Sequence, residues 1–115
     1  TEVRAADYIA MQDRRRDWIV RVERALEGFD ALVCPTVPIV APPIAALAED
    51  AAFFQANGLL LRNTFAINML DGCSFSLPCH APGELPAGLM LSSVRGDDAR
   101  LAAVALAVEP ALRFD

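Results

Sequence analysis

The sequence contains no lysine, and all ten of its basic residues are arginines. Arginine stays protonated at physiological pH, whereas a lysine can lose its proton and serve as a base. Chemistry that depends on a deprotonated lysine is therefore excluded for this chain alone. Histidine is almost as scarce, since His80 is the one histidine. A serine–histidine–aspartate triad could use only this residue as its base.

Cysteine is limited to Cys34, Cys73 and Cys79. An odd number cannot all pair, no two have the spacing of zinc ligands, and a single histidine is available to complete a metal site. We interpret all three as reduced and mostly buried thiols of a cytoplasmic protein. A glycine-rich phosphate loop is also missing, because Gly96 stands alone in its turn. We therefore expect neither a metal nor a cofactor.

Positive charge is sparse as well. The net charge is −5 and the isoelectric point is near 4.7. The one basic run, Arg14-Arg15-Arg16, is flanked by Asp13 and Asp17, which is typical of a solvated helix face. Such a chain binds nucleic acid or an anionic membrane poorly, and no apolar stretch reaches the roughly 20 residues of a membrane span. We expect neither a nucleic-acid nor a membrane partner.

Apolar side chains, by contrast, are in excess. They make up 55% of the 115 residues before glycine is counted, whereas ordinary globular chains reach about 45–50% with glycine included. A single domain of this length has one modest core, so the surplus must be buried against other surface. The remainder of a larger protein and a second copy of the chain, forming a dimer, are the two candidates.

The pattern of apolar residues predicts the order of the elements. Apolar residues recur at threes and fours over 3–26 and again over 48–70, which predicts two helices, the second apolar nearly all round and buried on several sides. A short apolar run at 31–34 predicts a buried strand, and four prolines between 35 and 43 force an extended loop. Runs at 74–79 and 87–94 predict a hairpin, followed by a helix over 99–112. Together they predict an α/β fold of about three strands with helices packed on both faces.

Few side chains suggest chemistry. Cys79 and His80 could form a nucleophile and its base, but adjacent residues of a strand point to opposite faces, so a turn histidine beside a buried cysteine is the favoured interpretation. The acidic pairs Glu49-Asp50 and Asp97-Asp98 stand at predicted helix starts, where capping accounts for them.

Three polar residues interrupt the apolar helix predicted over 48–70. They are Asn63, Thr64 and Asn68. Such residues either bond within a core or line a pocket. The residues alone favour the first interpretation.

Four blocks of the sequence resemble the amidase signature family. The blocks are FDALVCPTVP at 29–38 with Ala41-Pro42, NTF at 63–65 with Asn68 and SLPC at 76–79, LPAGLML at 85–91, and GDDARL at 96–101. Their order and spacing match the family across about residues 8–112, nearly the whole chain. The resemblance implies that residues 1–115 are a single piece, the C-terminal part of an amidase domain whose N-terminal catalytic part is absent.

Family members hydrolyse carboxylic amides with a serine, a second serine in a cis peptide, and a lysine, and the nucleophile lies in a Gly/Ser-rich signature. This chain has no lysine, and none of its four serines has such a setting. The resemblance therefore implies a fragment that is inactive alone and that supplies core and part of the pocket for a small amide substrate in the complete enzyme. The alternative is a free-standing, non-catalytic binding or oligomerisation module related to amidases.

The resemblance also nominates substrate-binding residues. In similar enzymes the helix before the Asn-x-x block faces the acyl side of the substrate, which implies that Asn63, Thr64, Ile67 and Asp71 line the pocket. Many members have Asn-x-x-Gly-x-Pro where this chain has NMLDGC at 68–73. That departure leaves the substrate open.

Overall fold

The computed structural model describes residues 2–113. Its elements are α1 (Ala5–Ala25), β1 (Leu32–Pro35), the short 3-10 helix η1 (Ile44–Leu47), α2 (Asp50–Leu70), β2 (Cys73–Pro78), β3 (Gly88–Ser93), α3 (Asp98–Val108) and the 3-10 helix η2 (Glu109–Leu112). The predicted order of helix, strand, helix, strand, strand, helix is confirmed. The last helix is shorter than predicted, because Pro110 falls in the 3-10 turn that ends it.

The three strands form one antiparallel sheet in the order β1-β3-β2. The predicted hairpin is confirmed as β2 and β3, with Phe75 opposite Leu91, and β1 pairs with the other edge of β3 so that Val33 also lies opposite Leu91. Because β3 is central, the four residues from Met90 to Ser93 are all buried.

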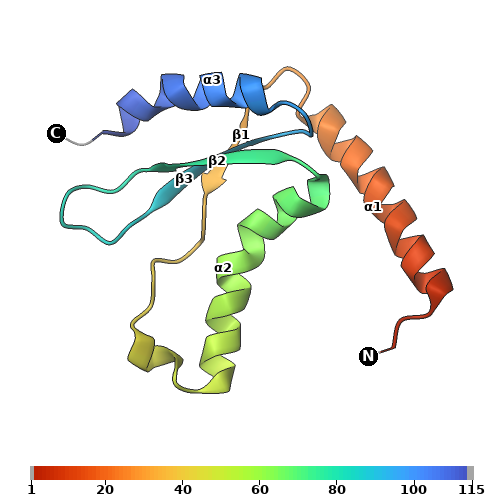
Figure 1. Ribbon diagram of the computed structural model, residues 1–115, viewed down its shortest axis with the longest axis horizontal. Coiled ribbons are helices and arrows are strands. Elements are labelled where there is room, and N and C mark those ends of the chain that lie inside the picture. The colour runs from red at the N-terminus through yellow and green to blue at the C-terminus, as the bar shows by residue number, and fades with distance from the viewer. Residues whose placement is uncertain (1, 114–115) are drawn as a thin grey trace.

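Helix α3 covers one face of this sheet (Figure 1). Leu101 and Ala105, one helical turn apart, pack on Leu91 and form the core of the chain. The spacing of four residues on α3 and the alternation of side chains along β3 bring these three together. The core is small, since the described chain buries only six hydrophobic residues.

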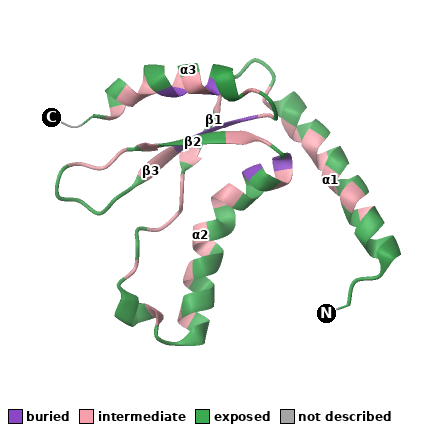
Figure 2. Ribbon diagram, viewed as in Figure 1, coloured by how far each residue is buried: buried purple, intermediate pink, exposed green. Residues whose placement is uncertain are grey.

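Helix α2 lies beside the sheet only at its C-terminal end, and its N-terminal end lies far from the sheet (Figure 1). Only Ile67 and Leu70 of this helix are buried, as Figure 2 shows by the purple segments at its end. The predicted burial on several sides is therefore wrong for the described chain, because α1, η1 and the bond from Asn63 to Pro35 leave most of the helix uncovered. Gly72 permits the close approach at the end, since a Cβ there would overlap the Ser93 carbonyl oxygen.

The capping predictions are correct in position and wrong in mechanism. Glu49 and Asp97 are the N-cap residues of α2 and α3, yet neither side chain bonds to a backbone N–H of its helix. The Asp97 carboxylate instead bonds to Ser93 and Arg100. The charged Arg100 guanidinium is a stronger hydrogen-bond partner for the Asp97 carboxylate than a backbone N–H of the helix would be.

The described chain is a thin slab rather than a sphere. Its principal extents are 55 × 44 × 18 Å and its Cα radius of gyration is 17.3 Å. A compact domain of 115 residues has a radius of gyration of about 13 Å. The two long helices, which extend from the sheet like the sides of a V, account for the excess (Figure 1).

Candidate functional site

The four predicted pocket residues lie in the C-terminal half of α2 and its cap. Asn63, Ile67 and Asp71 follow one another at intervals of four residues and so lie along one side of the helix, with Thr64 next to Asn63. Their side chains have different partners.

Asn63 fastens α2 to the end of β1. Its Nδ2 donates to the Pro35 carbonyl oxygen at 2.7 Å. Its Oδ1 accepts from the Nε of Arg62 at 3.3 Å. The amide is thus engaged on both sides, and its contact with Pro35 places it where the proline-rich loop leaves the sheet.

Thr64 keeps more of its hydrogen-bonding capacity. Its Oγ1 donates to the Leu61 carbonyl oxygen at 3.2 Å, and a hydroxyl that donates one bond can still accept two. The residue is half-buried, whereas Ile67, one turn further on, is buried. Thr64 therefore combines partial exposure with an acceptor that is free, and unlike Asn63 and Asp71 it has no side-chain bond to another element.

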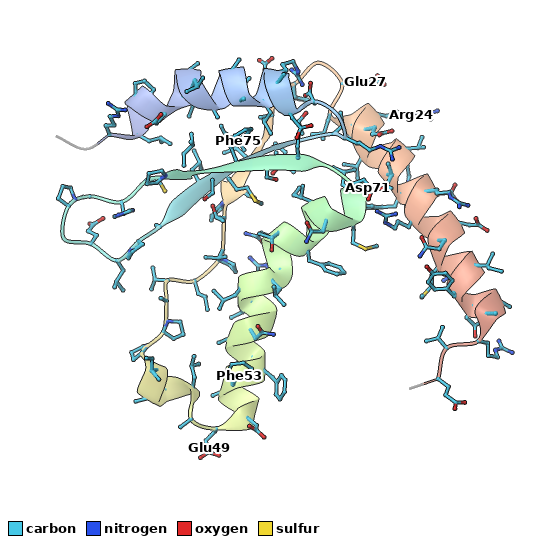
Figure 3. All side chains as sticks on the ribbon, viewed as in Figure 1. Arg24, Glu27, Glu49, Phe53, Asp71 and Phe75 are labelled. Atoms are coloured by element: carbon cyan, nitrogen blue, oxygen red, sulfur yellow. The ribbon has the colours of Figure 1, made fainter. Side chains whose placement is uncertain are left out.

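Asp71 is held by α1. It is the left-handed C-cap of α2, with φ 57°. The Arg15 guanidinium donates to its Oδ1 at 2.5 Å and, through Nε, to the Met69 carbonyl oxygen at 2.9 Å. Figure 3 shows Asp71 at the end of α2 beside α1. Its carboxylate therefore links the two long helices.

A contact between two hydroxyl groups, close to the place where Asn63 bonds to Pro35, was not predicted. Thr36 Oγ1, just after β1, and Ser76 Oγ on β2 lie 2.5 Å apart across β3. They meet because Gly88 lies between them, and a Cβ there would be 2.6 Å from Ser76 Oγ and 2.7 Å from Thr36 Oγ1. Gly88, at the start of the central strand, is the feature of the sequence that allows this contact. Its role can be recognised only when the register of the three strands is known.

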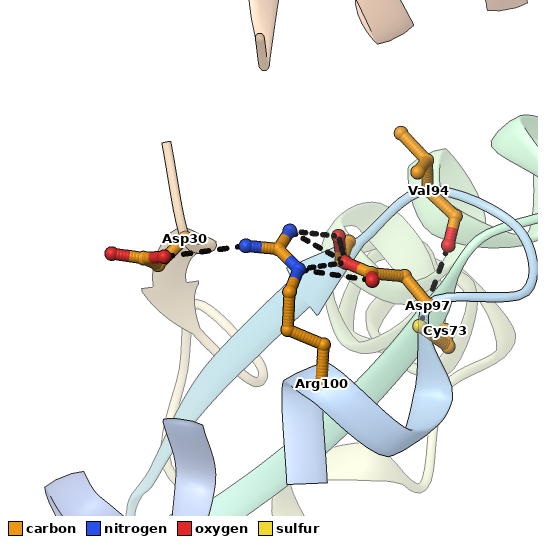
Figure 4. A network of polar contacts seen from close by, with 6 residues as sticks. Asp30, Cys73, Val94, Asp97 and Arg100 are labelled. Carbon is orange, nitrogen blue, oxygen red and sulfur yellow. Dashed lines mark hydrogen bonds and ion pairs between the residues drawn. The ribbon is translucent and has the colours of Figure 1, made fainter. Parts of the chain in front are cut away.

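Arg100 is the centre of a second polar network (Figure 4). Its guanidinium bonds to Asp97 at 2.6 Å and to Asp30 at 3.2 Å, and the Ser93 hydroxyl donates to Asp97 at 2.5 Å. The hydrogen bonds from Arg100, and then from Ser93, hold the pKa of Asp97 below its usual value. The same bond to Asp97 raises the pKa of Arg100. The network ties the turn before β1 to the start of α3.

The cysteine and histidine residues show no catalytic pairing. The Ala87 N–H donates to His80 Nδ1 at 3.3 Å in the loop after β2, and no hydrogen bond joins His80 to Cys79 in the described part of the chain. Burial, and then the charges of Asp98 and Asp97, raise the pKa of the Cys73 thiol. Across residues 2–113, no group of three or more His, Cys, Asp or Glu side chains is arranged to hold a metal ion.

Comparison with known proteins identifies the family. The profile of the family described as Amidase matches residues 1–102. The chain belongs to the amidase family. A related sequence, a glutamyl-tRNA(Gln) amidotransferase subunit from Salinispora arenicola, is 38% identical over 108 residues, which are 91% of this chain and 21% of the relative.

Other amidase relatives differ in the activity that their names describe. The 2-amino-5-chloromuconic acid deaminase of Comamonas testosteroni is 31% identical over 87 residues, 75% of this chain and 19% of its own length. The indoleacetamide hydrolase of Rhizobium radiobacter is 34% identical over 98 residues, 77% of this chain and 20% of its own length. The chain thus spans about a fifth of the length of these relatives.

Solved structures show that the fold is that of amidases. A crystal structure of an amidase superposes with a TM-score of 0.71 at 23% identity, covering 96% of this chain and 26% of that one. The corresponding amidotransferase subunit from Thermotoga maritima also gives 0.71, at 24% identity, covering 91% of this chain and 23% of its own. None of the helices within 2–113 is both long enough and apolar enough to cross a membrane.

Proposed function

We propose that this chain is part of an amide hydrolase and contributes core and one wall of the substrate pocket. The observation that carries the proposal is the family match over residues 1–102. The amidase fold supports it, because the three-stranded sheet and its helices superpose on an amidase. The reaction is the hydrolysis of a small carboxylic amide to the acid and the amine.

The groups that break the amide bond belong, in this proposal, to another part of a longer polypeptide. A serine, a second serine in a cis peptide and a lysine form the expected triad. The chain has no lysine, and its described residues contain no cis peptide bond. The 115-residue chain alone is accordingly expected to be inactive.

Thr64 is the pocket residue that the structure makes easiest to test. Its free acceptor lone pairs could receive a hydrogen bond from a substrate, and Asn63 beside it would fix the position of the helix against β1. Ile67 and Asp71 would hold this part of α2 in place, Ile67 by its packing and Asp71 through its bond to Arg15. The pocket wall would therefore be the part of α2 that starts at Asn63.

The experiment is a kinetic comparison in the complete polypeptide. Ammonia release from a series of unbranched acyl amides gives kcat/KM against acyl length for the parent, for Thr64→Leu and for Ala66→Leu. Ala66 is an exposed residue two positions along α2, so Ala66→Leu places the same leucine side chain on another side of the helix. We expect Thr64→Leu alone to change the ratio of long to short substrates by about tenfold, the effect of one or two methylene groups in a pocket. An unchanged ratio would remove Thr64 from the pocket, and no hydrolysis of any amide by the complete polypeptide would refute the function itself.

A further inference from the structure

The chain exposes more surface than a free-standing protein of its mass. Its accessible surface is 8410 Å², whereas the scaling for compact monomers gives about 6,100 Å² at 12.4 kDa. The difference of about 2,300 Å² is well above the roughly 800 Å² that each partner contributes to a standard interface. A surplus of this size is expected on a surface that another structural element covers.

One strip of α1 contributes to this surface. Arg15 marks the side of α1 that faces α2, because its guanidinium reaches the Met69 carbonyl oxygen. Met11 and Trp18 are four and three residues from Arg15, and Tyr8 is seven residues from it, so all three share its side of the helix. Tyr8 and Met11 are exposed. Most of this strip is therefore apolar and uncovered.

A matching strip runs along α2. Phe54, Leu61, Phe65 and Asn68 are spaced by seven, four and three residues, which is the repeat of the contact positions in a helix that packs along another helix. Asn68 and its neighbour Met69 lie at the α1 side, as the bond from α1 to the Met69 carbonyl shows. Phe54, Leu61 and Phe65 are all exposed. Gly58 occupies the position of this repeat between Phe54 and Leu61, so the exposed surface of the strip is supplied by the three large apolar residues.

The two strips face each other across a V. Figure 1 shows α1 and α2 separating from the place where the end of α2 lies beside α1, and Figure 3 shows Asp71 at that place. A hollow of about 620 Å³ opens there, lined by Met11, Gln12, Arg14, Arg15, Trp18, Asn68 and Met69. We use the name α1–α2 groove for this hollow together with the apolar strips that lead away from it, and we call these strips its walls: Tyr8, Met11 and Trp18 on α1 and Phe54, Leu61 and Phe65 on α2.

We propose that the α1–α2 groove holds a helix from another part of the same, longer polypeptide. Each wall is a helix of 21 residues, about 32 Å long, and a helix with an apolar stripe fits between two such walls. The relatives are about five times as long as the stretch they share with this chain, so they hold ample sequence for it. The inference rests on the proposed function in that it places this chain within a longer amidase.

A second copy of the chain fits the groove less well. It would have to insert its own α1 or α2 as the third helix. Both helices already serve as walls and are joined at the apex by Arg15 and Asp71. The inserted helix would therefore have to leave its own partner, or two grooves would have to share one helix.

The test measures how accessible the groove is in the complete polypeptide. Met11→Cys and Phe65→Cys place a thiol on each wall, and Ile9→Cys is the control. Ile9 is 60% exposed against 49% for Met11, and two residues along a helix turn the side chain by about 200°. Rates of alkylation by a maleimide are read by peptide mass at each site. Thermal midpoints within a few degrees of the parent show that the variants are folded.

We expect both wall positions to react at least about tenfold more slowly than position 9, the protection given by packing that must open before a reagent enters. Equal rates at the three positions would overturn the inference. So would protection that appears only at concentrations where light scattering reports a dimer, because a second copy would then fill the groove. The readout does not depend on hydrolysis, so a protected groove in a polypeptide that cleaves no amide would refute the proposed function and leave the groove assignment standing.

Discussion

Replacing Asp71 separates a role in shape from a role in substrate contact. Asp71 has φ 57°, a region that costs side chains other than glycine roughly 1 kcal/mol. Its ion pair with Arg15 opposes that cost, and because the two side chains are 42% and 23% exposed, the pair contributes no more than about 1 kcal/mol. Asp71→Gly removes both effects. We therefore expect its free energy of unfolding to stay within about 0.5 kcal/mol of the parent.

Two further variants make the comparison decisive. Asp71→Ala loses the ion pair and keeps the backbone conformation that already costs the parent, so it should be less stable than the parent by up to about 1 kcal/mol. Arg15→Met loses the ion pair and also the bond to the Met69 carbonyl oxygen, for a total of about 2 kcal/mol. The expected order of stability is parent and Asp71→Gly together, then Asp71→Ala, then Arg15→Met.

Thermal unfolding and kcat/KM of the complete polypeptide are the assays. A midpoint for Asp71→Gly as low as that of Asp71→Ala would refute the argument from backbone conformation. If Asp71→Gly unfolds like the parent but loses amide hydrolysis by more than about tenfold, a difference of about 1.4 kcal/mol in the transition state, Asp71 contacts the substrate and is no longer only a link between α1 and α2.

Two other predictions concern the contacts around β3. Gly72→Ala places a methyl group against the Ser93 carbonyl oxygen and should destabilise the protein by about 1–3 kcal/mol; an unchanged thermal midpoint would show that the end of α2 can move away at no cost. The pKa of Asp97 is lowered from 3.8, so its bonds to Arg100 and Ser93 stabilise the fold above pH 3.8 and lose that effect as the pH falls through the lower folded-state pKa. Asp97→Asn should lower the thermal midpoint at about pH 7 and approach the parent at about pH 2.5; a gap that is the same at both pH values would contradict this.

Local patterns were sufficient to predict the elements. The hairpin of β2 and β3 follows from the alternating run at 74–79, the turn residues Gly83, Glu84 and Pro86, and the second run at 87–94. The strand β1 follows from four residues between an aspartate and a proline run. These signals depend on neighbours in the sequence, so no knowledge of the fold is needed to read them. The amidase fold could be expected as well, because the blocks that carry the resemblance lie on these same elements.

The long-range contacts could not be predicted from one sequence. Arg15 and Asp71 are separated by 56 residues, and nothing in either segment identifies the other. Thr36 and Ser76 meet only because Gly88 falls between them in the register. The exposure of α2 was missed for a different reason, since apolar residues all round a helix predict burial but do not say which polypeptide provides it. The four pocket residues stay predictions, with Thr64 the first to test.

The strand order has a consequence for how the chain behaves when it is separated from its neighbours. With β3 in the middle, the outer backbone groups of both β1 and β2 lack a strand partner within residues 2–113. Each of these strands ends in a proline, Pro35 or Pro78, which removes one donor but leaves the others free. An open edge accepts any extended segment that comes alongside. The sheet can therefore grow in both directions, as part of a wider sheet in a complete enzyme, or as an aggregate in a concentrated solution of this chain alone.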